Sequence, residues 1–311
     1  MRMQEIKTVG IVGAGTMGRR IGFGCIIRGV KVKIFDIKPE AAQEAVLAIQ
    51  GLIEEREADG RLRRGTLAAA LPFLSISPTL KDCVSGVDMV IENVPEKVEL
   101  KRRVFSEISG YAGDATLLGT NTSSIPGSQI ADATGRPEKF FNFNWGKPDD
   151  VRVEVMGNPR TSPETIAAVM AFLKKLGIIP IHVKREIMGY GCNRIWRAVK
   201  KEVLFLIEGG YLSPEEIDRG WMLEWETDIG PCGSMDYIGL DVVRDIEMNY
   251  FKASGNPSDR PPRFLEEMIV QGKLGMKTGE GFYRYPHPAY KRPGWLKDEL
   301  ETRLDTKGRT Q

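Results

Sequence analysis

The sequence predicts an α/β protein in which a doubly wound, mostly parallel sheet is followed by an all-helical C-terminal domain. Strand and helix patterns alternate through the first half, an order typical of parallel strands joined by crossover helices. A glycine-rich turn joins the first strand to the first helix. After about residue 185 only helical patterns remain, so we expect one domain over residues 1–185 and a second over residues 186–311.

The first domain is expected to begin with a strand and to alternate from there. Short apolar runs bounded by turn residues indicate buried strands, and longer amphipathic stretches indicate helices. Pro39 and Pro163 suit the first turn of a helix, and Ser162 suits an N-cap. The expected strands are residues 7–13, 30–36, 73–77, 88–94, 115–121, 139–144, 151–156 and 178–183. The expected helices are residues 16–29, 39–60, 61–72, 97–112 and 162–177.

The second domain is expected to contain helices only. The first of them has one apolar face, as a helix packed against others does. Ser213 and Glu216 have the spacing of a capping box, which marks the start of the next helix. The expected helices are residues 188–210, 213–225, 234–254 and 262–272.

Composition and charge disfavour several classes of function. The chain has 311 residues, with 44 Lys and Arg against 42 Asp and Glu, and a formal net charge of +2. This balance provides no field that would favour nucleic acid or an anionic membrane. Four widely spaced cysteines and two histidines lack metal-ligand spacing, so no metal is expected. We find neither a membrane-spanning run nor a leader sequence, and expect a cytoplasmic protein with reduced thiols.

The glycine-rich turn has the pattern of a dinucleotide-binding fingerprint. Gly13-x-Gly15-x-x-Gly18 lies between a strand and a helix, and Asp36 ends the second strand 18 residues after Gly18. The glycines allow a tight turn and close approach of a pyrophosphate, which the N–H groups of the helix N-terminus favour. The Asp36 carboxylate accepts hydrogen bonds from a ribose 2′-hydroxyl and repels a 2′-phosphate, so NAD is expected rather than NADP. The residues expected to contact the cofactor here are Gly13, Gly15, Thr16, Met17, Gly18 and Asp36.

Segments along nearly the whole chain are similar to one family. They are, in order, VGIVGAGTMGRRI, DMVIENVPEKVELKRRVF, TNTSSIPGSQIADAT, RPEKF, VRVEVMGNPRTSPET, NRIW, GPCGSMDYIGLD and LGMKTGEGFYRY. With these motifs the chain resembles the L-3-hydroxyacyl-CoA dehydrogenases, whose relatives include gulonate dehydrogenase and lambda-crystallin. The resemblance implies a Rossmann-like NAD-binding domain and a helical C-terminal domain that forms a homodimer. It also implies an active site between the two domains.

The resemblance implies roles for individual residues as well. Ser123, in the NTSS motif, and Asn193, in the second domain, match residues that contact the substrate oxygen in the family. Glu154 matches the glutamate that orients the family's catalytic histidine, although the segment before it is two residues shorter here. The residues that match the family's cofactor site are Glu96, Lys101, Ser123 and Lys277.

The chain departs from the family where the catalytic base is expected. The family has His-Phe-Phe-Asn-Pro where residues 144–148 of this chain are NWGKP. The 21 residues from Ser123 to Asn144 equal the family's spacing from serine to histidine, so Asn144 takes the place of the base. Lys147 takes the place of an asparagine that touches the cofactor. Met188 replaces the proline of the family's Pro-Gly-Phe turn.

Oxidation of a secondary alcohol by NAD requires a group that accepts the hydroxyl proton. The amide of Asn144 cannot accept it, although it can hold a hydroxyl or carbonyl oxygen by hydrogen bonds. Lys147 could accept the proton if burial beside a cation lowers its pKa, and Glu154 or a bound water are alternatives. Lys147 is otherwise a solvated turn residue or binds a substrate carboxylate. Of the two histidines, His182 is better explained as a structural residue, and His287 lies near the C-terminal tail.

Three functions are compatible with these residues. The first is an NAD-dependent oxidoreductase with an unusual proton acceptor, acting on a secondary alcohol. The second is a reaction that begins with hydride removal and continues as an elimination or decarboxylation. The third is a catalytically silent NAD-binding homologue, which the missing base favours. Because the chain retains the other substrate and cofactor residues of the family, which a silent scaffold does not need, we expect an enzyme of the first kind.

The substrate is expected to be either a 3-hydroxyacyl-CoA or a small 3-hydroxy acid or polar alcohol. Residues 52–71 resemble the helical hairpin that contacts CoA in the family, and Arg61, Arg63 and Arg64 could bind its phosphates. An exposed basic helix end explains the same three arginines without CoA. The sequence therefore leaves the two substrate classes open.

Overall fold

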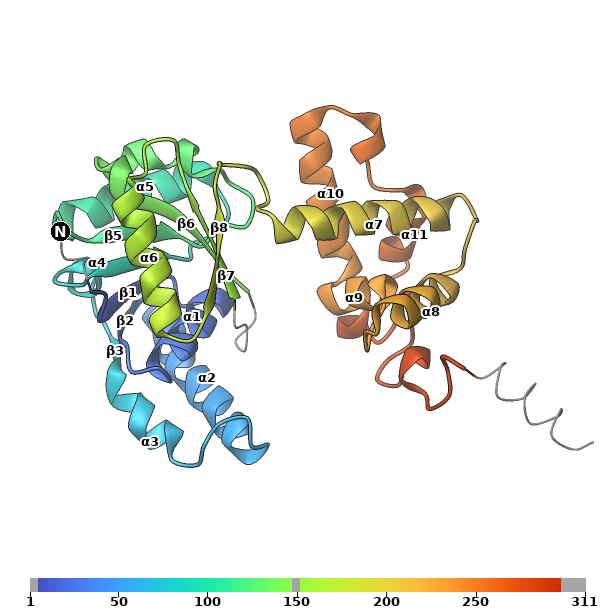
Figure 1. Ribbon diagram of the computed structural model, residues 1–311, viewed down its shortest axis with the longest axis horizontal. Helices are drawn as coiled ribbons and strands as arrows, with labels where there is room; N and C mark the ends of the chain where they lie inside the picture. Colours follow the sequence, from blue (N-terminus) through green and yellow to red (C-terminus); the bar gives the residue numbers. More distant parts are fainter. Residues whose placement is uncertain (1–4, 147–151, 298–311) are drawn as a thin grey trace, which may run out of the picture. The chain divides into compact units, whose positions relative to one another are not determined.

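The structure, a computed structural model, describes residues 5–146 and 152–297. The chain divides into two compact units, Met1–Cys192 and Asn193–Gln311 (Figure 1). The division between the units follows Cys192, whereas the strand pattern of the sequence ends at about residue 185. Each unit buries hydrophobic clusters of its own, so each is described separately.

An eight-stranded sheet runs through the first unit in the order β3-β2-β1-β4-β5-β6-β7-β8. The strands are β1 (Thr8–Val12), β2 (Lys31–Phe35), β3 (Leu74–Ile76), β4 (Met89–Glu92), β5 (Leu117–Thr120), β6 (Phe140–Trp145), β7 (Arg152–Gly157) and β8 (Ile179–Val183). All neighbouring strands are parallel except β6 and β7, which are antiparallel. The predicted doubly wound, mostly parallel sheet is confirmed. Its strand order reverses between β1 and β4, where such sheets bind ligands.

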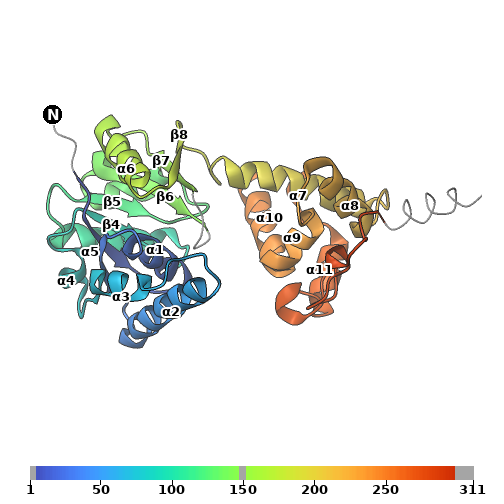
Figure 2. The same ribbon diagram turned by 60° about the horizontal axis from the view of Figure 1, so that its bottom comes forward.

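Helices cover both faces of this sheet. They are α1 (Thr16–Ile26), α2 (Pro39–Ala58), α3 (Thr66–Ala70), α4 (Leu80–Val84), α5 (Val98–Tyr111) and α6 (Pro163–Lys175). One hydrophobic cluster joins α1, α2, α3 and α6 to one face, and another joins α4 and α5 to the other. In Figures 1 and 2, α2 and α3 form a helical hairpin beside β3, as the sequence predicted.

The alternation of aromatic residues and asparagines along β6 separates the two faces of the sheet. Phe141, Phe143 and Trp145 pack into the cluster that contains α1 and α6. Successive strand side chains alternate between faces, so Asn142 and Asn144 lie on the face covered by α4 and α5. The two asparagines therefore do not interrupt the apolar surface that packs against α1 and α6.

The second unit is helical within residues 193–297, apart from isolated bridges near residues 275–284. Its helices are α7 (Cys192–Glu208), α8 (Pro214–Trp225), α9 (Pro231–Ile238), α10 (Leu240–Ser254) and α11 (Arg263–Val270). The predicted capping box at the start of α8 is confirmed, because Ser213 accepts the N–H of Glu216 while the Glu216 side chain accepts the N–H of Ser213. The core of the unit includes Val203, Met235 and Leu265.

Several predicted helix boundaries were wrong, and backbone conformation explains two of them. The expected helix over 234–254 is two helices, α9 and α10, divided at Gly239, whose φ of +102° lies outside the helical region. The helix expected from residue 188 begins at Cys192, because Gly189 and Tyr190 have φ of +82° and +55°. Both turns change the direction of the chain without a proline, so the apolar pattern alone does not show them.

Short 3-10 helices connect several of these elements. They are η1 (Leu71–Phe73), η2 (Gly127–Gln129), η3 (Ala131–Thr134), η4 (Pro137–Lys139), η5 (Pro257–Asp259), η6 (Met276–Thr278) and η7 (Ala289–Lys291). No helix in residues 5–146 or 152–297 is long and apolar enough to cross a membrane. Across the same residues the four cysteines are free, and no group of three His, Cys, Asp or Glu side chains could hold a metal ion.

Candidate active site

The glycine-rich turn between β1 and α1 has the geometry that a dinucleotide fingerprint requires. Gly13 has a φ of +99°, and a Cβ there would lie 2.8 Å from the Asn93 carbonyl oxygen. A Cβ on Gly18 would lie 2.0 Å from the Gly13 carbonyl oxygen, so neither position admits a side chain. A Cβ on Gly15 would meet no heavy atom within 4 Å outside its chain neighbours. A ligand can therefore approach the backbone at Gly15.

The N-terminus of α1 and the carboxylate of Asp36 complete a site that fits NAD. The N-cap of α1 is Gly15, which has no side chain to cap the helix that begins with Thr16 and Met17, so among the described residues the N–H groups of its first turn suit a pyrophosphate. Asp36 follows β2, and its carboxylate accepts the N–H of Ala14 at 2.8 Å and of Lys38 at 3.0 Å. These bonds hold the carboxylate beside the turn, where one dinucleotide can contact both.

A buried ion pair lies at the carboxyl end of β4. Glu92 is 0 % exposed and Lys101 is 1 % exposed, and Lys101 Nζ lies 2.8 Å from Glu92 Oε1. Thr120 donates to the other carboxylate oxygen at 2.7 Å, and the N–H of Val94 donates to Oε1 at 2.6 Å. Burial raises the pKa of Glu92, and the positive charge of Lys101 opposes that shift. The Lys101 side chain is therefore buried inside the first unit, and its Nζ lies 3.5 Å from Glu96 Oε2.

Glu96 fixes the loop that carries Ser123. Its Oε1 accepts the Thr122 hydroxyl at 2.5 Å, the N–H of Ser123 at 3.1 Å and the N–H of Ser124 at 3.0 Å. Burial acts to raise the pKa of Glu96, but the hydrogen bond from Thr122 and the charge of Lys101 lower it overall. An ionised Glu96 thus holds the loop in place, and Ser123 stays exposed at its tip.

Asn144 and Glu154 lie side by side on β6 and β7. They are register partners in the antiparallel pair, and Asn144 Nδ2 donates a hydrogen bond to Glu154 Oε2 at 2.9 Å. Glu154 is 0 % exposed, and its Oε1 accepts the N–H groups of Gly191 and Cys192, both at 2.9 Å. The guanidinium of Arg152, whose side chain is 42 % exposed, lies 3.8 Å from Glu154 Oε2.

The carboxylate of Glu154 determines which end of the Asn144 amide faces the site. An ionised carboxylate only accepts hydrogen bonds, so the amide nitrogen must face Glu154 and the amide oxygen turns away from it. Asn144 thereby offers a fixed hydrogen-bond acceptor at the position that the resemblance assigns to the catalytic histidine. Unlike histidine, it cannot take a proton at ordinary pH.

The loop after β5 is tied to the end of β6. The N–H of Trp145 donates to Asn121 Oδ1 at 3.0 Å, and Ser123 follows two residues later. Because β5 and β6 are parallel neighbours, their carboxyl ends meet at one edge of the sheet. This edge brings together Glu96, Ser123, Asn144 and Glu154, four of the predicted site residues.

Three other predicted site residues are not placed in this group. Lys147 lies outside the residues that the structure describes. Asn193, in the first turn of α7, belongs to the second unit. Lys277 also belongs to that unit, and its Nζ lies 2.6 Å from both carboxylate oxygens of Asp241. Their roles in the site remain predictions.

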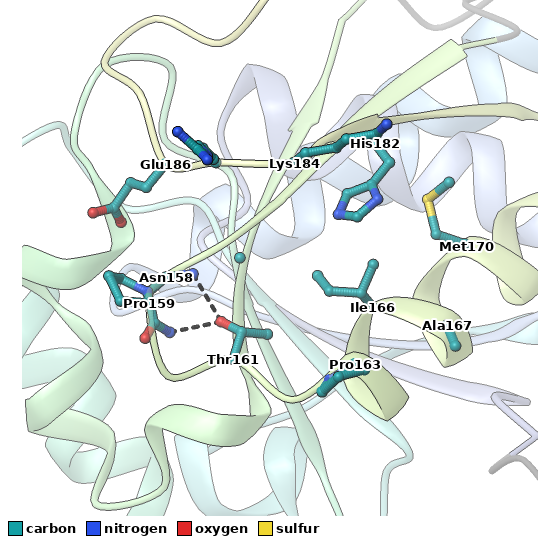
Figure 3. Close-up of a pocket in the computed structure, with 12 residues that line it drawn as sticks. Asn158, Pro159, Thr161, Pro163, Ile166, Ala167, Met170, His182, Lys184 and Glu186 are labelled. Carbon is teal, nitrogen blue, oxygen red and sulfur yellow. Dashed lines mark hydrogen bonds between the residues drawn. The ribbon is translucent and has the colours of Figure 1, made fainter.

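His182 lies on the opposite face of the sheet from Asn144. Its register partner Val155 packs with α1 and α6, so the two neighbours share that face. Figure 3 shows the imidazole beside Ile166 and Met170 of α6, in a surface hollow whose lining contains none of the predicted site residues. This placement supports the structural interpretation of His182 over the catalytic one.

The arginines considered for CoA binding have neighbours of their own. Arg61 lies 2.6 Å from Asp59 and 3.1 Å from Glu55, in the connection between α2 and α3. Arg63 and Arg64 are exposed in the same connection. The exposure of these arginines fits both explanations that the sequence left open, an exposed helix end and a site for CoA phosphates.

Sequence reasoning missed two charged residues of the site, Glu92 and Arg152. A glutamate inside the apolar strand 88–94 is costly unless it is paired, and that signal could have identified Glu92 as the partner of Lys101. Arg152 stands two residues before Glu154 on the same strand, so strand alternation places both side chains on one face. That spacing could have identified Arg152 as a neighbour of Asn144.

The fold and these residues define a class of protein. The dinucleotide-binding turn lies where the strand order reverses, and polar side chains gather at the carboxyl ends of the adjacent strands. This combination is that of a nicotinamide-dependent dehydrogenase. A model of the NAD binding domain of 3-hydroxyacyl-CoA dehydrogenase matches residues 8–187, and a model of the C-terminal domain matches residues 189–285. The chain belongs to the 3-hydroxyacyl-CoA dehydrogenase family and is an NAD-dependent enzyme of that kind.

Two curated relatives illustrate the range of the family. The chain is 31% identical over 283 residues to a probable 3-hydroxybutyryl-CoA dehydrogenase of Bacillus subtilis, a match that covers 90% of this chain and 98% of the relative. It is 30% identical over 290 residues to the 5-formyl-3-hydroxy-2-methylpyridine 4-carboxylate 5-dehydrogenase of Mesorhizobium japonicum, covering 90% and 91%. The names of these relatives therefore include both a CoA thioester and a free carboxylate.

Solved structures agree with this assignment. The (S)-3-hydroxybutyryl-CoA dehydrogenase of Ralstonia eutropha has a TM-score of 0.84 and 34% identity, over 91% of this chain and 100% of that one. A 5-formyl-3-hydroxy-2-methylpyridine 4-carboxylic acid 5-dehydrogenase, described as an NAD-dependent dismutase, has a TM-score of 0.71 and 27% identity, over 97% and 96%. The fold is common to an enzyme named for a CoA thioester and to one named for a free carboxylic acid.

Proposed function

We propose that this enzyme oxidises the hydroxyl group of a small 3-hydroxy acid, or of a 3-hydroxyacyl-CoA, and that the proton goes to a group other than Asn144. The observation that carries the proposal is the hydrogen bond of 2.9 Å between Asn144 Nδ2 and Glu154 Oε2. It leaves the amide oxygen to face the substrate. Asn144 then holds a hydroxyl but cannot deprotonate it.

The residues of the site have distinct roles in this proposal. Bound NAD supplies the hydride acceptor, which the glycine-rich turn and Asp36 hold. The Asn144 Oδ1 accepts a hydrogen bond from the substrate hydroxyl, and the exposed Ser123 hydroxyl contacts the same oxygen. Glu154 acts on the substrate only through Asn144, whose amide it orients.

Lys147 is our proposed proton acceptor, because Glu154 is poorly placed for that role. Glu154 is 0 % exposed and already accepts three N–H groups, so its carboxylate is covered and has no open face toward a substrate. Lys147 follows Asn144 by three residues. A lysine that is neutral near working pH can accept a hydroxyl proton, and loss of a general base typically lowers the rate about 10²–10⁴-fold.

Arg152 favours a substrate that carries a carboxylate close to its hydroxyl. Its guanidinium is half exposed and lies 3.8 Å from Glu154 Oε2, the same oxygen that accepts the Asn144 amide. Guanidinium groups bind carboxylates in a bidentate geometry, and the Arg152 side chain is 42 % exposed, so a substrate carboxylate can reach it. The relative from Mesorhizobium japonicum, whose named substrate carries a carboxylate, supports the free acid as the better substrate.

We also propose that the enzyme is a homodimer in the cytoplasm, with Asn193 and Lys277 of the second unit completing the site. Support for a dimer comes from the family resemblance and from large apolar side chains on the second unit, such as Ile195 at 70% and Trp225 at 63% exposed. Where such side chains form a contiguous patch, another chain commonly covers it. Sedimentation of the purified protein measures the assembly directly.

Formation of NADH with (S)-3-hydroxybutyrate and with (S)-3-hydroxybutyryl-CoA tests the proposed function. We expect turnover of the free acid, a loss of about tenfold or more in its kcat/KM in Arg152→Met, and little change for the CoA ester. Equal losses for both substrates would contradict the role of Arg152.

Lys147→Ala should lower kcat about 10²–10⁴-fold and remove the rise of rate with pH, because the neutral lysine is the reactive form. An unchanged rate in Lys147→Ala removes it as the base, and NADH binding without any turnover supports a silent homologue.

A further inference from the structure

The turn before α7 contacts both halves of the candidate site. The Tyr190 hydroxyl donates to the carbonyl oxygen of Thr122 at 2.8 Å, next to Ser123 in the chain. The next two residues, Gly191 and Cys192, donate their N–H groups to Glu154. One short segment therefore contacts both parts of the site. The Tyr190 side chain binds the loop that carries Ser123, and the backbone of Gly191 and Cys192 binds Glu154, which holds Asn144.

The backbone of Tyr190 is held in an unusual conformation. Its φ of +55° lies in the left-handed region, which a bulky residue with a Cβ seldom adopts. Glu226 is the other non-glycine residue with positive φ in the described ranges. Conformations of this kind persist where surrounding contacts impose them, and they concentrate at functional sites. Here the left-handed turn allows the Tyr190 side chain to contact Thr122 while the N–H groups of the next two residues contact Glu154.

We propose that Tyr190 is a positioning residue whose hydroxyl fixes Thr122, and thereby sets the position of Ser123 relative to Asn144. The proposal rests on the function proposed above for Ser123 and Asn144. In this arrangement the turn at residues 189–192 positions both residues that contact the substrate oxygen. It positions Ser123 through the Tyr190 hydroxyl and Asn144 through Glu154. The two contacts therefore keep a fixed separation.

Tyr190 does not handle the proton itself. It is 1 % exposed, and its hydroxyl hydrogen is engaged with the Thr122 carbonyl. Burial raises the pKa of Tyr190 above its usual range, so the group stays neutral at any working pH. Tyr190 contributes by positioning Ser123. Its replacement should therefore change the effect of Ser123 on kcat and leave the pH dependence of the rate unchanged.

Hydrogen exchange in the full-length protein tests whether the hydroxyl anchors the loop. The N–H groups of Ser123 and Ser124 donate to Glu96, and that of Ile125 donates to Thr122 Oγ1, so all three are protected while the loop is held. Tyr190→Phe removes one oxygen and keeps the ring. We expect exchange at residues 123–125 to rise about tenfold, with the thermal midpoint nearly unchanged. Unchanged exchange there would overturn the proposal.

A matched control separates anchoring from the loss of any tyrosine hydroxyl. Tyr111, on α5 of the same unit, is 44% exposed, and Tyr111→Phe removes an equivalent oxygen far from the site residues. We expect no change of exchange at residues 123–125 in this control. A general destabilisation by Tyr190→Phe would instead raise exchange throughout the first unit and lower the thermal midpoint, and would count against a specific role for Tyr190.

A double-mutant cycle tests whether Tyr190 acts through Ser123. We expect Tyr190→Phe to lower kcat about tenfold in the parent, with the affinity for NADH unchanged, and less than about twofold in Ser123→Ala. Additive losses would mean that Tyr190 acts independently of Ser123 and would overturn the proposal. If the parent turns over neither substrate, the proposed function fails, and the exchange measurement still decides whether Tyr190 holds the loop.

Discussion

The amide of Asn144 has two chemically different ends, and at the scale of single residues the carboxylate of Glu154 selects between them. Histidine paired with this glutamate would present a nitrogen that takes a proton. Asparagine held in the same way presents an oxygen that only accepts a hydrogen bond. Gly191 and Cys192 donate N–H groups to the other oxygen of Glu154, so the carboxylate that orients Asn144 is itself held in place. In the proposed function, Asn144 orients the substrate hydroxyl and leaves proton transfer to another group.

Glu154→Gln should reverse the Asn144 amide. The oxygen of the new side-chain amide would keep the N–H groups of Gly191 and Cys192, so its NH₂ would face Asn144, whose oxygen would turn to accept it. The site would then offer an N–H donor, which suits a ketone better than an alcohol. We expect the ratio of ketone to alcohol affinity to rise about tenfold, the value of one hydrogen bond of about 1.4 kcal/mol. Inhibition constants for acetoacetate and 3-hydroxybutyrate measure this ratio.

Glu164→Gln is the matched control for that substitution. Glu164 is exposed in the first turn of α6, so the same change of a carboxylate to an amide should leave both affinities as they are. If Glu154→Gln weakens both ligands equally, the amide of Asn144 does not reverse and the orientation argument is wrong.

Single residues differ in how far the sequence reveals them. Gly13, Gly18 and Asp36 were predictable because their roles depend on local backbone geometry and on spacing along the chain. The position of Asn144 followed from its distance to Ser123. Tyr190 was not predictable, because its contact with Thr122 joins residues 68 positions apart and depends on a positive φ that no motif encodes.

At the scale of elements, the packing of α1 against β6 fixes the strand that carries Asn144. Gly24 of α1 faces Trp145, and a Cβ on Gly24 would lie 2.3 Å from Trp145 Cζ2. The indole is 1 % exposed, so it has no space to move into. The helix comes close to the strand only because this position has no side chain. Asn144 precedes Trp145, so the same contact fixes the end of β6.

Gly24→Ala should destabilise the protein by about 1–3 kcal/mol, because overpacking of the core outweighs the better helix propensity of alanine. Urea unfolding measures the change. Gly51→Ala, in α2, is the matched control, because a Cβ at Gly51 meets no atom within 4 Å. That variant should gain about 0.5–1 kcal/mol from helix propensity alone. Destabilisation of both variants to the same extent would show that the contact with Trp145 is not the cause.

Element existence was more predictable than element boundaries. Each strand and helix expected from periodicity over residues 7–183 has a counterpart, because burial on one or two faces sets the pattern. The division between α9 and α10 at Gly239 escaped prediction. A Cβ there would lie 2.9 Å from Asp241 Oδ1 and 3.1 Å from Lys277 Nζ, so both the positive φ and contacts that include a residue 38 positions away favour glycine at the division.

At the scale of the whole molecule, the two units have different chemistry. The glycine-rich turn, Asp36 and the pair of Asn144 with Glu154 belong to the first unit, which the sequence identified by its motifs. The second unit contains two carboxylates that the sequence did not single out, Asp218 and Asp236, which are 0% and 1% exposed. Buried carboxylates make the stability of a unit depend on pH, and their burial cannot be deduced from residue type.

Asp236 should make the second unit less stable as pH rises from about 4 to about 6. Its carboxylate accepts the N–H groups of Phe282 and Tyr283 and the hydroxyl of Tyr285, yet burial raises its pKa from 3.8 to about 6. Because the folded state binds this proton more tightly than the unfolded state, its contribution to stability is complete below about pH 4. This contribution to the free energy of unfolding amounts to about 3 kcal/mol, and it is lost as the pH rises through about 6.

Asp236→Asn cannot ionise, so comparing it with the parent isolates this contribution from all other titrating groups. The amide also loses hydrogen bonds, and the variant should be less stable than the parent at every pH. The gap in the free energy of unfolding should nevertheless narrow from pH 4 to pH 6.5, because only the parent loses stability there. Tryptophan emission follows the second unit, which holds Trp196, Trp221, Trp225 and Trp295, four of the five tryptophans. A gap that stays constant or widens over this range would mean that Asp236 titrates at its ordinary pKa, and that the N–H groups around it outweigh its burial.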